Sequence, residues 1–406
     1  MELTQGFKFS ANGEWKDLDC LNPSLRSDIL LVIKAFIQQH PDAGMDHDPD
    51  WLYSKCTSDK SVKIFVCVAK DGSLLGYAPF FIHPSSLNFG LFGLSLFDYP
   101  IRRYSITAGP LLAVDHPAPQ ILLRNLFLEL CDFLGQRDVL FGLGVEGESS
   151  FWHFLSFDAD LKKKYKILPS GNAYKRRFII LPKSFDEYVK KLANHARQDV
   201  RRALRKVEND PEVKASYRVF TNPDEVPEFL TLAQTVSEKT YQKTLLDLGI
   251  RDNPETCRRL TFAAEKGWLR SYILTFKGEP VAMRHGFLYR KAYYAEQTGY
   301  DPRWSKWSVG TSIYMHAIRD LINIGVGKFD FLYGDNEKKR SLSNAYRMEQ
   351  NFYLIPRRFP LLVIAYGLRL FNAIAQLLGD FMDKNDIKIT IRRFLRKLAT
   401  KKSNNR

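Results

Sequence analysis

The sequence has few cysteines and no long uncharged apolar run, and both features exclude classes of protein. Its five cysteines form no C-x-x-C pair, so we expect neither a disulfide framework nor a zinc site. The first residues show no signal peptide. The apolar stretch from Phe359 to Met382 is interrupted by Arg369 and Asp380, which leaves halves well short of the roughly 20 residues of a spanning helix. We therefore expect a cytoplasmic protein.

Familiar catalytic motifs are also missing. The sequence contains no HExxH motif, no Walker loop and no Ser-His-Asp order. We therefore expect no metal. The composition is that of a folded protein, since 45% of the 406 residues are apolar and 13% are aromatic. This length favours two domains.

The net charge of +15 is concentrated in two places. Residues 1–160 hold 12 basic and 20 acidic side chains, whereas residues 161–218 hold 17 and 6. Residues 383–406 hold 9 basic and 2 acidic side chains. Localised positive charge indicates anionic partners, such as phosphate, nucleic acid or an acidic membrane surface.

The two halves of the chain show a similar order of helices and strands. Hydrophobic periodicity in the first half predicts helices at 24–40 and 118–135. It predicts strands at 62–68, 74–82 and 139–143. In the second half it predicts strands at 178–181, 269–276, 280–288, 292–298 and 329–332, with helices at 187–207, 225–238 and 310–324. Ser184 to Glu187 fits a capping box, and the polar stretch 162–175 is a candidate junction. This repetition predicts a duplicated α/β domain.

The stretch Gly299 to Thr311 joins a predicted strand to a predicted helix. Backbone N–H groups at a helix start can bind an anion, and hydroxyl and cationic side chains nearby would add to the site. An ordinary helix start with two packed tryptophans is the alternative. The residues that form this candidate anion site are Arg303, Lys306, Ser308, Val309, Gly310 and Thr311, with Trp304 able to shield it.

Arginines four residues apart form a stripe on the predicted helix 187–207. Arg197, Arg201 and Arg205 lie on one face, and guanidinium groups suit phosphate binding. A solvated basic face is the simpler interpretation, although few acidic side chains are interspersed to relieve the repulsion.

Two places could supply acid–base chemistry. Glu296 lies in a predicted strand among aromatic residues, and His285 lies in the neighbouring strand. Asp335 follows another strand end, where sites in α/β sheets gather, and Lys338 beside it could stabilise an oxyanion. A hydrogen-bonded core histidine and a solvated loop are the structural alternatives.

The C-terminal region 359–406 has an amphipathic pattern. From Ile387 onward, apolar side chains share one helical face and basic side chains occupy the other. Such helices lie on anionic membranes, while docking on the protein's own body is the alternative.

The second half resembles tandem GNAT-fold acyltransferases of the CelD-like group, which are associated with cellulose and exopolysaccharide biosynthesis. The resemblance rests on Gly299-Tyr300-Asp301-Pro302-Arg303-Trp304, the Ser308-Val309-Gly310 helix start, Phe329-Asp330-Phe331 and the arginine-rich helix from His195. These enzymes are related in fold to the Fem peptidoglycan aminoacyltransferases. Of the GNAT pyrophosphate loop Q/R-x-x-G-x-G/A, only Gly310 matches.

The resemblance implies two GNAT-like domains in tandem, each a mixed twisted sheet flanked by helices. The segments would be a first domain at 1–165 without catalytic activity, an acyltransferase domain at 170–358 and a basic amphipathic tail at 359–406. Acetyl-CoA or another acyl-CoA would donate the acyl group. Glu296, Asp335, Lys338 and His285 are the candidate catalytic residues, and the candidate substrate-binding residues are Arg197, Arg201, Arg205, Trp304 and Tyr333.

The acceptor implied by the resemblance is an amine or hydroxyl of a phosphorylated or lipid-linked sugar for the cell envelope or an exopolysaccharide, bound between the domains. The tail would hold the enzyme at the inner face of the plasma membrane, and no DNA partner is expected. Two rival hypotheses remain, a Fem-type aminoacyltransferase that uses aminoacyl-tRNA and a non-enzymatic phosphate- or membrane-binding protein.

Overall fold

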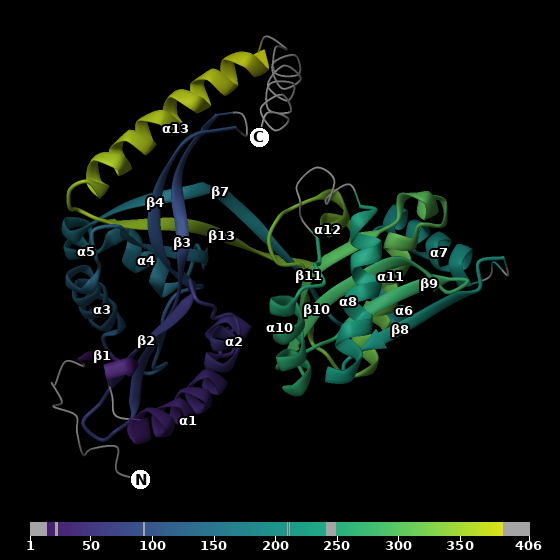
Figure 1. Cartoon of the computed structure of the whole chain (residues 1–406), viewed down its shortest axis with the longest axis horizontal. Helices are drawn as coiled ribbons and strands as arrows, with labels where there is room; N and C mark the ends of the chain where they lie inside the picture. The colour runs from purple at the N-terminus through teal and green to yellow at the C-terminus, as the bar shows by residue number, and fades with distance from the viewer. Residues whose placement is uncertain are drawn as a thin grey trace. The chain divides into compact units, whose positions relative to one another are not determined.

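A computed structural model describes residues 14–20, 23–91, 94–208, 210, 212–240 and 249–384, and the chain folds into two compact units (Figure 1). The first unit comprises residues 1–172 and 350–406, and the second comprises residues 173–349. The division falls inside the strand β7 (Tyr165–Ile180), so residues 165–175 of the polar stretch predicted as a junction are extended chain rather than a loop. The strand β13 (Ala345–Pro356) also runs from one unit into the other.

The first unit is a mixed sheet with helices. Its strands follow the order β1-β2-β3-β4-β6-β13, and β5 pairs with β3. These strands are β1 (Trp15–Asp17), β2 (Ser61–Val68), β3 (Leu74–Leu91), β4 (Leu94–Thr107), β5 (Leu111–Leu112) and β6 (Asp138–Glu146). The helices are α1 (Pro23–Gln39), α2 (Pro49–Ser54), α3 (Pro119–Phe133), α4 (Ser150–Phe157), α5 (Ala159–Lys164) and α13 (Leu361–Lys384). The helices predicted at 24–40 and 118–135 are confirmed as α1 and α3.

The helix α13 belongs to the first unit, whereas the sequence grouped it with a separate tail. Among the residues that the structure describes, no helix has the length and hydropathy needed to cross a membrane. The basic segment 385–406, on which the predicted membrane-binding helix falls, lies outside the described residues.

The second unit has the strand order β7-β12-β11-β10-β9-β8. Its own strands are β8 (Ala215–Phe220), β9 (Ser271–Phe276), β10 (Glu279–Tyr289), β11 (Ala292–Tyr300) and β12 (Lys328–Asp330). Its helices are α6 (Phe185–Lys191), α7 (Asn194–Glu208), α8 (Val226–Glu238), α10 (Pro254–Glu265), α11 (Val309–Asn323) and α12 (Glu337–Leu342), and the 3-10 helix η4 (Pro302–Trp307) precedes α11. The three-strand meander and the helices at 225–238 and 310–324 are thereby confirmed. Strands β8 and β13 and helices α10 and α12 were not predicted.

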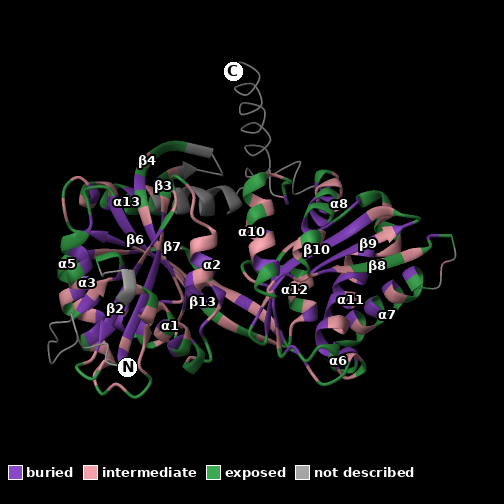
Figure 2. Cartoon of the chain, turned by 60° about the horizontal axis from the view of Figure 1, so that its bottom comes forward, coloured by how far each residue is buried: buried purple, intermediate pink, exposed green. Residues whose placement is uncertain are grey.

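Helices cover both faces of this sheet, and the strands between them are largely buried (Figure 2). Successive side chains of a strand point to opposite faces, so Arg284 and His285 of β10 mark the two sides. The Arg284 guanidinium lies 4.2 Å from the Tyr314 ring of α11, whereas the His285 ring lies 5.7 Å from Phe229 of α8. Helix α7 packs against α11, and its Ala196, Val200 and Val207 join the core on the α11 side.

The single helix predicted at 187–207 is wrong, because the structure divides it into α6 and α7. Ser184 caps the start of α6, with its hydroxyl accepting from the Glu187 N–H, which is one of the two hydrogen bonds of the predicted capping box. Leu192 then adopts an extended conformation. The Arg197 guanidinium donates to the carbonyl oxygens of Lys190 (2.6 Å) and Leu192 (3.1 Å), which satisfies acceptors left open at the end of α6.

Candidate functional site

The structure brings Glu296 and His285 together on the α8 side of the sheet. Strands β10 and β11 pair so that Nε2 of His285 lies 3.2 Å from Oε2 of Glu296. The His285 side chain is 1% exposed, whereas that of Glu296 is 29% exposed and can reach a substrate. On its other edge, His285 Nδ1 lies 2.8 Å from the Ser271 hydroxyl, which is fully buried. Glu296 is thus a partly exposed carboxylate beside a buried imidazole.

A guanidinium completes this group. Arg259 of α10 lies 3.6 Å from Oε1 of Glu296, so the two oxygens of the carboxylate face different partners. A carboxylate with one fixed imidazole neighbour and partial exposure has the geometry of a general base. We refer to Ser271, His285, Glu296 and Arg259 as the carboxylate–imidazole group.

The start of α11 offers backbone donors. Ser308 caps the helix in a left-handed conformation (φ 55°), and its carbonyl accepts from the N–H groups of Thr311 and Ser312. Within the described residues, the N–H groups of Val309 and Gly310 make no backbone hydrogen bond outside the helix ladder. A Cβ on Gly310 would lie 3.0 Å from the Tyr300 ring, so glycine keeps the backbone there closely packed. These N–H groups suit an anion.

Lys338 lies at the same place. Its Nζ donates to the Thr311 hydroxyl over 2.6 Å. Burial lowers the pKa of Lys338, and the nearby Asp199 carboxylate opposes this change. The structure therefore groups Lys338 with Val309, Gly310 and Thr311, although the sequence assigned Lys338 to catalysis and the other three to the donor site. We refer to these four residues as the α11 site.

Other residues predicted for this loop have different partners. Arg303 donates to both oxygens of Asp301 and to Glu279. The Lys306 ammonium lies 3.9 Å from the centre of the Trp307 ring. Trp304 packs edge-on against Phe276. These contacts hold the loop together, and they do not direct the two cations at the N–H groups.

The arginine stripe of α7 is only partly exposed. Arg197 is occupied in closing α6, whereas Arg201 and Arg205 are exposed. Helix α7 lies on the α11 side of the sheet, so the structure does not bring the stripe together with Glu296. It lies instead beside the loop before α11, where the Lys206 ammonium donates to the Lys306 carbonyl over 2.7 Å.

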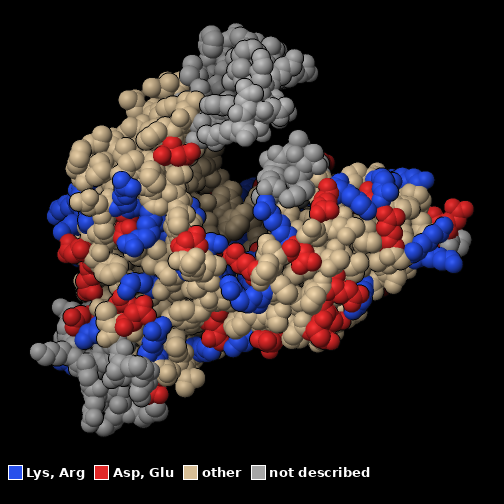
Figure 3. All heavy atoms as spheres, viewed as in Figure 1, with Lys and Arg blue, Asp and Glu red and all other residues tan. Residues whose placement is uncertain are grey.

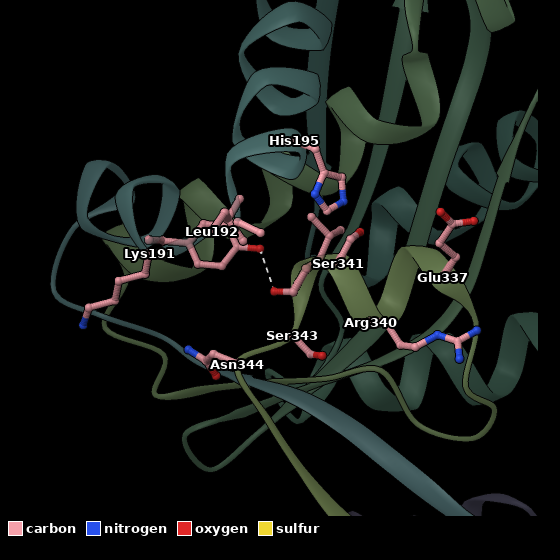
Figure 4. Close-up of a pocket in the computed structure, with 11 residues that line it drawn as sticks. Lys191, Leu192, His195, Glu337, Arg340, Ser341, Ser343 and Asn344 are labelled. Carbon is pink, nitrogen blue, oxygen red and sulfur yellow. Dashed lines mark hydrogen bonds between the residues drawn. The ribbon is translucent and has the colours of Figure 1, made fainter.

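A cavity of about 360 Å³ opens where α6, α7 and α12 meet (Figure 4). Figure 4 shows His195 at the start of α7 and Arg340 on the α12 side of the same cavity. The Tyr188 hydroxyl donates to the Leu342 carbonyl over 3.0 Å and ties α6 to α12. None of the predicted site residues lines this cavity.

Asp335 and Tyr333 lie in the loop between β12 and α12. Arg177 donates to Asp335 over 2.6 Å, and this hydrogen bond lowers the pKa of the carboxyl group. A carboxylate with a lowered pKa is a weak proton acceptor. Tyr333 is 41% exposed and lies 6.1 Å from the Tyr174 ring. The geometry thus favours Glu296 over Asp335 as a base.

Residues 194–340 match the family model described as an acetyltransferase (GNAT) domain. This stretch is similar to that family. The chain resembles the solved structure of FemX with 12% identity and a TM-score of 0.55, over 80% of this chain and 95% of that one. This likeness shows the fold. The predicted mixed α/β fold of GNAT type is therefore confirmed.

Two other solved structures are similar at a lower TM-score of 0.49. One is L-PGS from Bacillus licheniformis, with 13% identity over 86% of this chain and 96% of that one. The other is a tandem GNAT protein from the clavulanic acid biosynthesis pathway, with 11% identity over 85% of this chain and 98% of that one. No curated protein matches the sequence.

Within residues 194–340, Lys339 was only an alternative to Lys338 and was left out of the candidate site residues. Its Nζ donates to the carbonyl oxygens of Phe331, over 2.9 Å, and Tyr333, where β12 ends. Burial, reinforced by the Arg284 guanidinium, lowers its pKa to about 8. The pairing of β11 with β12 covers only Ala292 to Tyr294, so the two strands part near this lysine.

Ser271, Arg259 and Arg177 were missed as well. Each acts through a partner distant in the sequence, so only the register of the sheet or the packing of α10 identifies it. Within the described ranges, no group of three or more His, Cys, Asp or Glu side chains could hold a metal ion.

Proposed function

We propose that the GNAT domain transfers an acyl group from acetyl-CoA or a longer acyl-CoA to an amine or hydroxyl acceptor. The observation that carries this proposal is the α11 site, where free backbone N–H groups meet Lys338 and the Thr311 hydroxyl. A helix start with a neighbouring ammonium suits the pyrophosphate of CoA. The family match over residues 194–340 supports the same reaction class.

The exposed arginines of α7 fit the donor rather than the acceptor. Helix α7 contacts both α11 and η4, and it brings Arg201 and Arg205 to the side of the sheet that holds the α11 site. Guanidinium groups bind phosphate in a fork geometry. We therefore reassign Arg201 and Arg205 to the phosphates of the donor, and Arg197 to the structure of the helix pair.

The acceptor would bind on the α8 side, where Glu296 is accessible. Glu296 would take a proton from the amine or hydroxyl of the acceptor. The nitrogen or oxygen of that acceptor group would at the same time attack the thioester carbonyl. A tetrahedral oxyanion would form, and the carbon–sulfur bond would then break to release the CoA thiol. The half-buried ammonium of Lys339, at the end of β12, would stabilise the oxyanion, because Lys338 is assigned to the pyrophosphate.

A sugar precursor of the envelope or of an exopolysaccharide is the acceptor we propose. The predicted basic tail and the CelD-like resemblance motivate this choice. Incubation with radiolabelled acetyl-CoA and a panel of nucleotide-linked and lipid-linked amino sugars should label an acceptor. Glu296→Gln should abolish the labelling, while Asp335→Asn should retain it. Labelling only from aminoacyl-tRNA would replace this proposal with a Fem-type reaction, and labelling from neither donor would contradict both.

A further inference from the structure

Helix α13 exposes a continuous apolar stripe. Its members are large apolar side chains with exposed fractions of 60%, 47%, 63%, 48% and 69%, namely Val363, Tyr366, Leu370, Ile374 and Leu377. Their spacing of three or four residues places them on one side of the helix. At 1.5 Å per residue the stripe extends over about 21 Å. We refer to these five residues as the α13 stripe.

The opposite side of α13 is fixed to the first unit. Leu361, Ala365 and Leu368 are buried in a cluster that includes Leu87 and Ile355. This packing orients the helix, so the stripe is held outward by the fold. Isolated exposed apolar residues are ordinary, but a contiguous row indicates a surface that meets another apolar phase.

Apolar exposure continues onto the hairpin of β3 and β4. Leu96 is 64% exposed and Phe97 is 54% exposed. The Phe97 ring lies 5.7 Å from Phe89, which lies 5.7 Å from Phe371 of α13. Figure 3 shows few charged side chains on the visible surface over α13 and this hairpin. The hairpin and the helix thus contribute to one apolar surface.

The charge of the chain identifies the partner of this surface. Residues 383–406, which follow the stripe, hold 9 basic and 2 acidic side chains. The Lys166 ammonium also lies 4.9 Å from the centre of the Tyr366 ring, at the border of the stripe. Apolar side chains beside basic groups match the acyl chains and headgroups of an anionic bilayer. A second copy of the chain would bring a second segment of the same positive charge and fits less well.

We propose that the α13 stripe inserts into the surface of an anionic phospholipid bilayer, with α13 parallel to the membrane. The stripe supplies the apolar contact, and the basic residues that follow it supply the electrostatic attraction. This role is independent of the acyl transfer reaction, because every residue of the stripe lies in the first unit.

Flotation of the full chain with vesicles tests the proposal. The wild type should float with phosphatidylglycerol vesicles and should bind phosphatidylcholine vesicles more weakly. The triple variant Val363→Gln, Leu370→Gln and Leu377→Gln should lose at least tenfold in the bound fraction. The matched control is Leu31→Gln, Val114→Gln and Phe157→Gln, at first-unit residues that are 68%, 71% and 68% exposed and lie outside the stripe. It should bind as the wild type does.

The proposal is overturned if the wild type does not float, or if the stripe variant floats as well as the wild type. Sedimentation velocity without lipid distinguishes the second-copy alternative. A monomeric wild type supports the proposal, whereas a dimer that the stripe variant dissociates would assign the stripe to self-association. Circular dichroism of both variants shows that each retains the fold.

Discussion

Nε2 of His285 lies 3.2 Å from Oε2 of Glu296, although the imidazole is buried and the carboxylate is partly exposed. On this geometry we propose Glu296 as the general base of the acyl transfer reaction. Glu296→Gln should therefore lower kcat by roughly 10²- to 10⁴-fold, because the amide cannot accept the proton. The Kd for acetyl-CoA should stay near the wild-type value. Asp335→Asn is the control, since Asp335 is already paired with Arg177. Equal losses in both variants would contradict the assignment.

Ser271 positions the imidazole. Its hydroxyl is the hydrogen-bonding partner of Nδ1 of the buried His285. Ser271→Ala would leave a buried polar atom without that partner, which costs about 1–3 kcal/mol. Urea unfolding should show this loss, and kcat should fall more than KM changes. Ser305→Ala, at an exposed position, should leave both quantities unchanged. A Ser271→Ala protein of wild-type stability and kcat would refute this role.

Lys339 should make stability depend on pH. Burial lowers its pKa from 10.5 to about 8 in the folded protein, so between these values the unfolded chain binds a proton that the folded chain has lost. Folding therefore becomes more favourable as the pH rises through this window. The stability of the wild type relative to Lys339→Met should increase from pH 8 to pH 10. Lys183→Met removes an exposed lysine and is the control. The stability of the wild type relative to this variant should not change with pH. If the stability of the wild type relative to Lys339→Met did not change between pH 8 and pH 10, the lowered pKa would be contradicted.

Thr311 links Lys338 to the start of α11. Thr311→Val keeps the shape of the side chain but removes the hydroxyl that accepts from Lys338. Without this acceptor Lys338 would lose the contact that positions it at the start of α11, so acetyl-CoA affinity should fall roughly tenfold, which corresponds to about 1.4 kcal/mol. Thr235→Val, at a half-buried position of α8, is the control for the loss of a hydroxyl. Unchanged affinity in Thr311→Val would place the donor elsewhere.

Periodicity predicted the elements that carry the candidate site. The alternation in β10 and β11 and the apolar face of α11 are local patterns, and they were sufficient to place Glu296, His285 and Gly310. The pairing of His285 with Ser271 was not predictable, because a bulge between Pro280 and Ala282 shifts the register by one residue. Counting back from the turn without that bulge would place Ser271 opposite Arg284.

Long-range partners explain the remaining differences. The break between α6 and α7 depends on Arg197 satisfying the end of α6, which helical periodicity does not reveal. Asp335 looked like a base because Arg177, 158 residues away in the chain, was not visible as its partner. The separation of the arginine stripe from Glu296 depends on which face of the sheet α7 covers, and the sequence pattern left that open.

Calorimetric titration of the full chain with acetyl-CoA tests the central claim most directly. The account predicts saturable one-site binding that Thr311→Val weakens and Glu296→Gln leaves intact, since one residue belongs to the α11 site and the other acts on the acceptor. No heat and no thermal shift at millimolar acetyl-CoA would contradict the proposal that the GNAT domain uses an acyl-CoA donor.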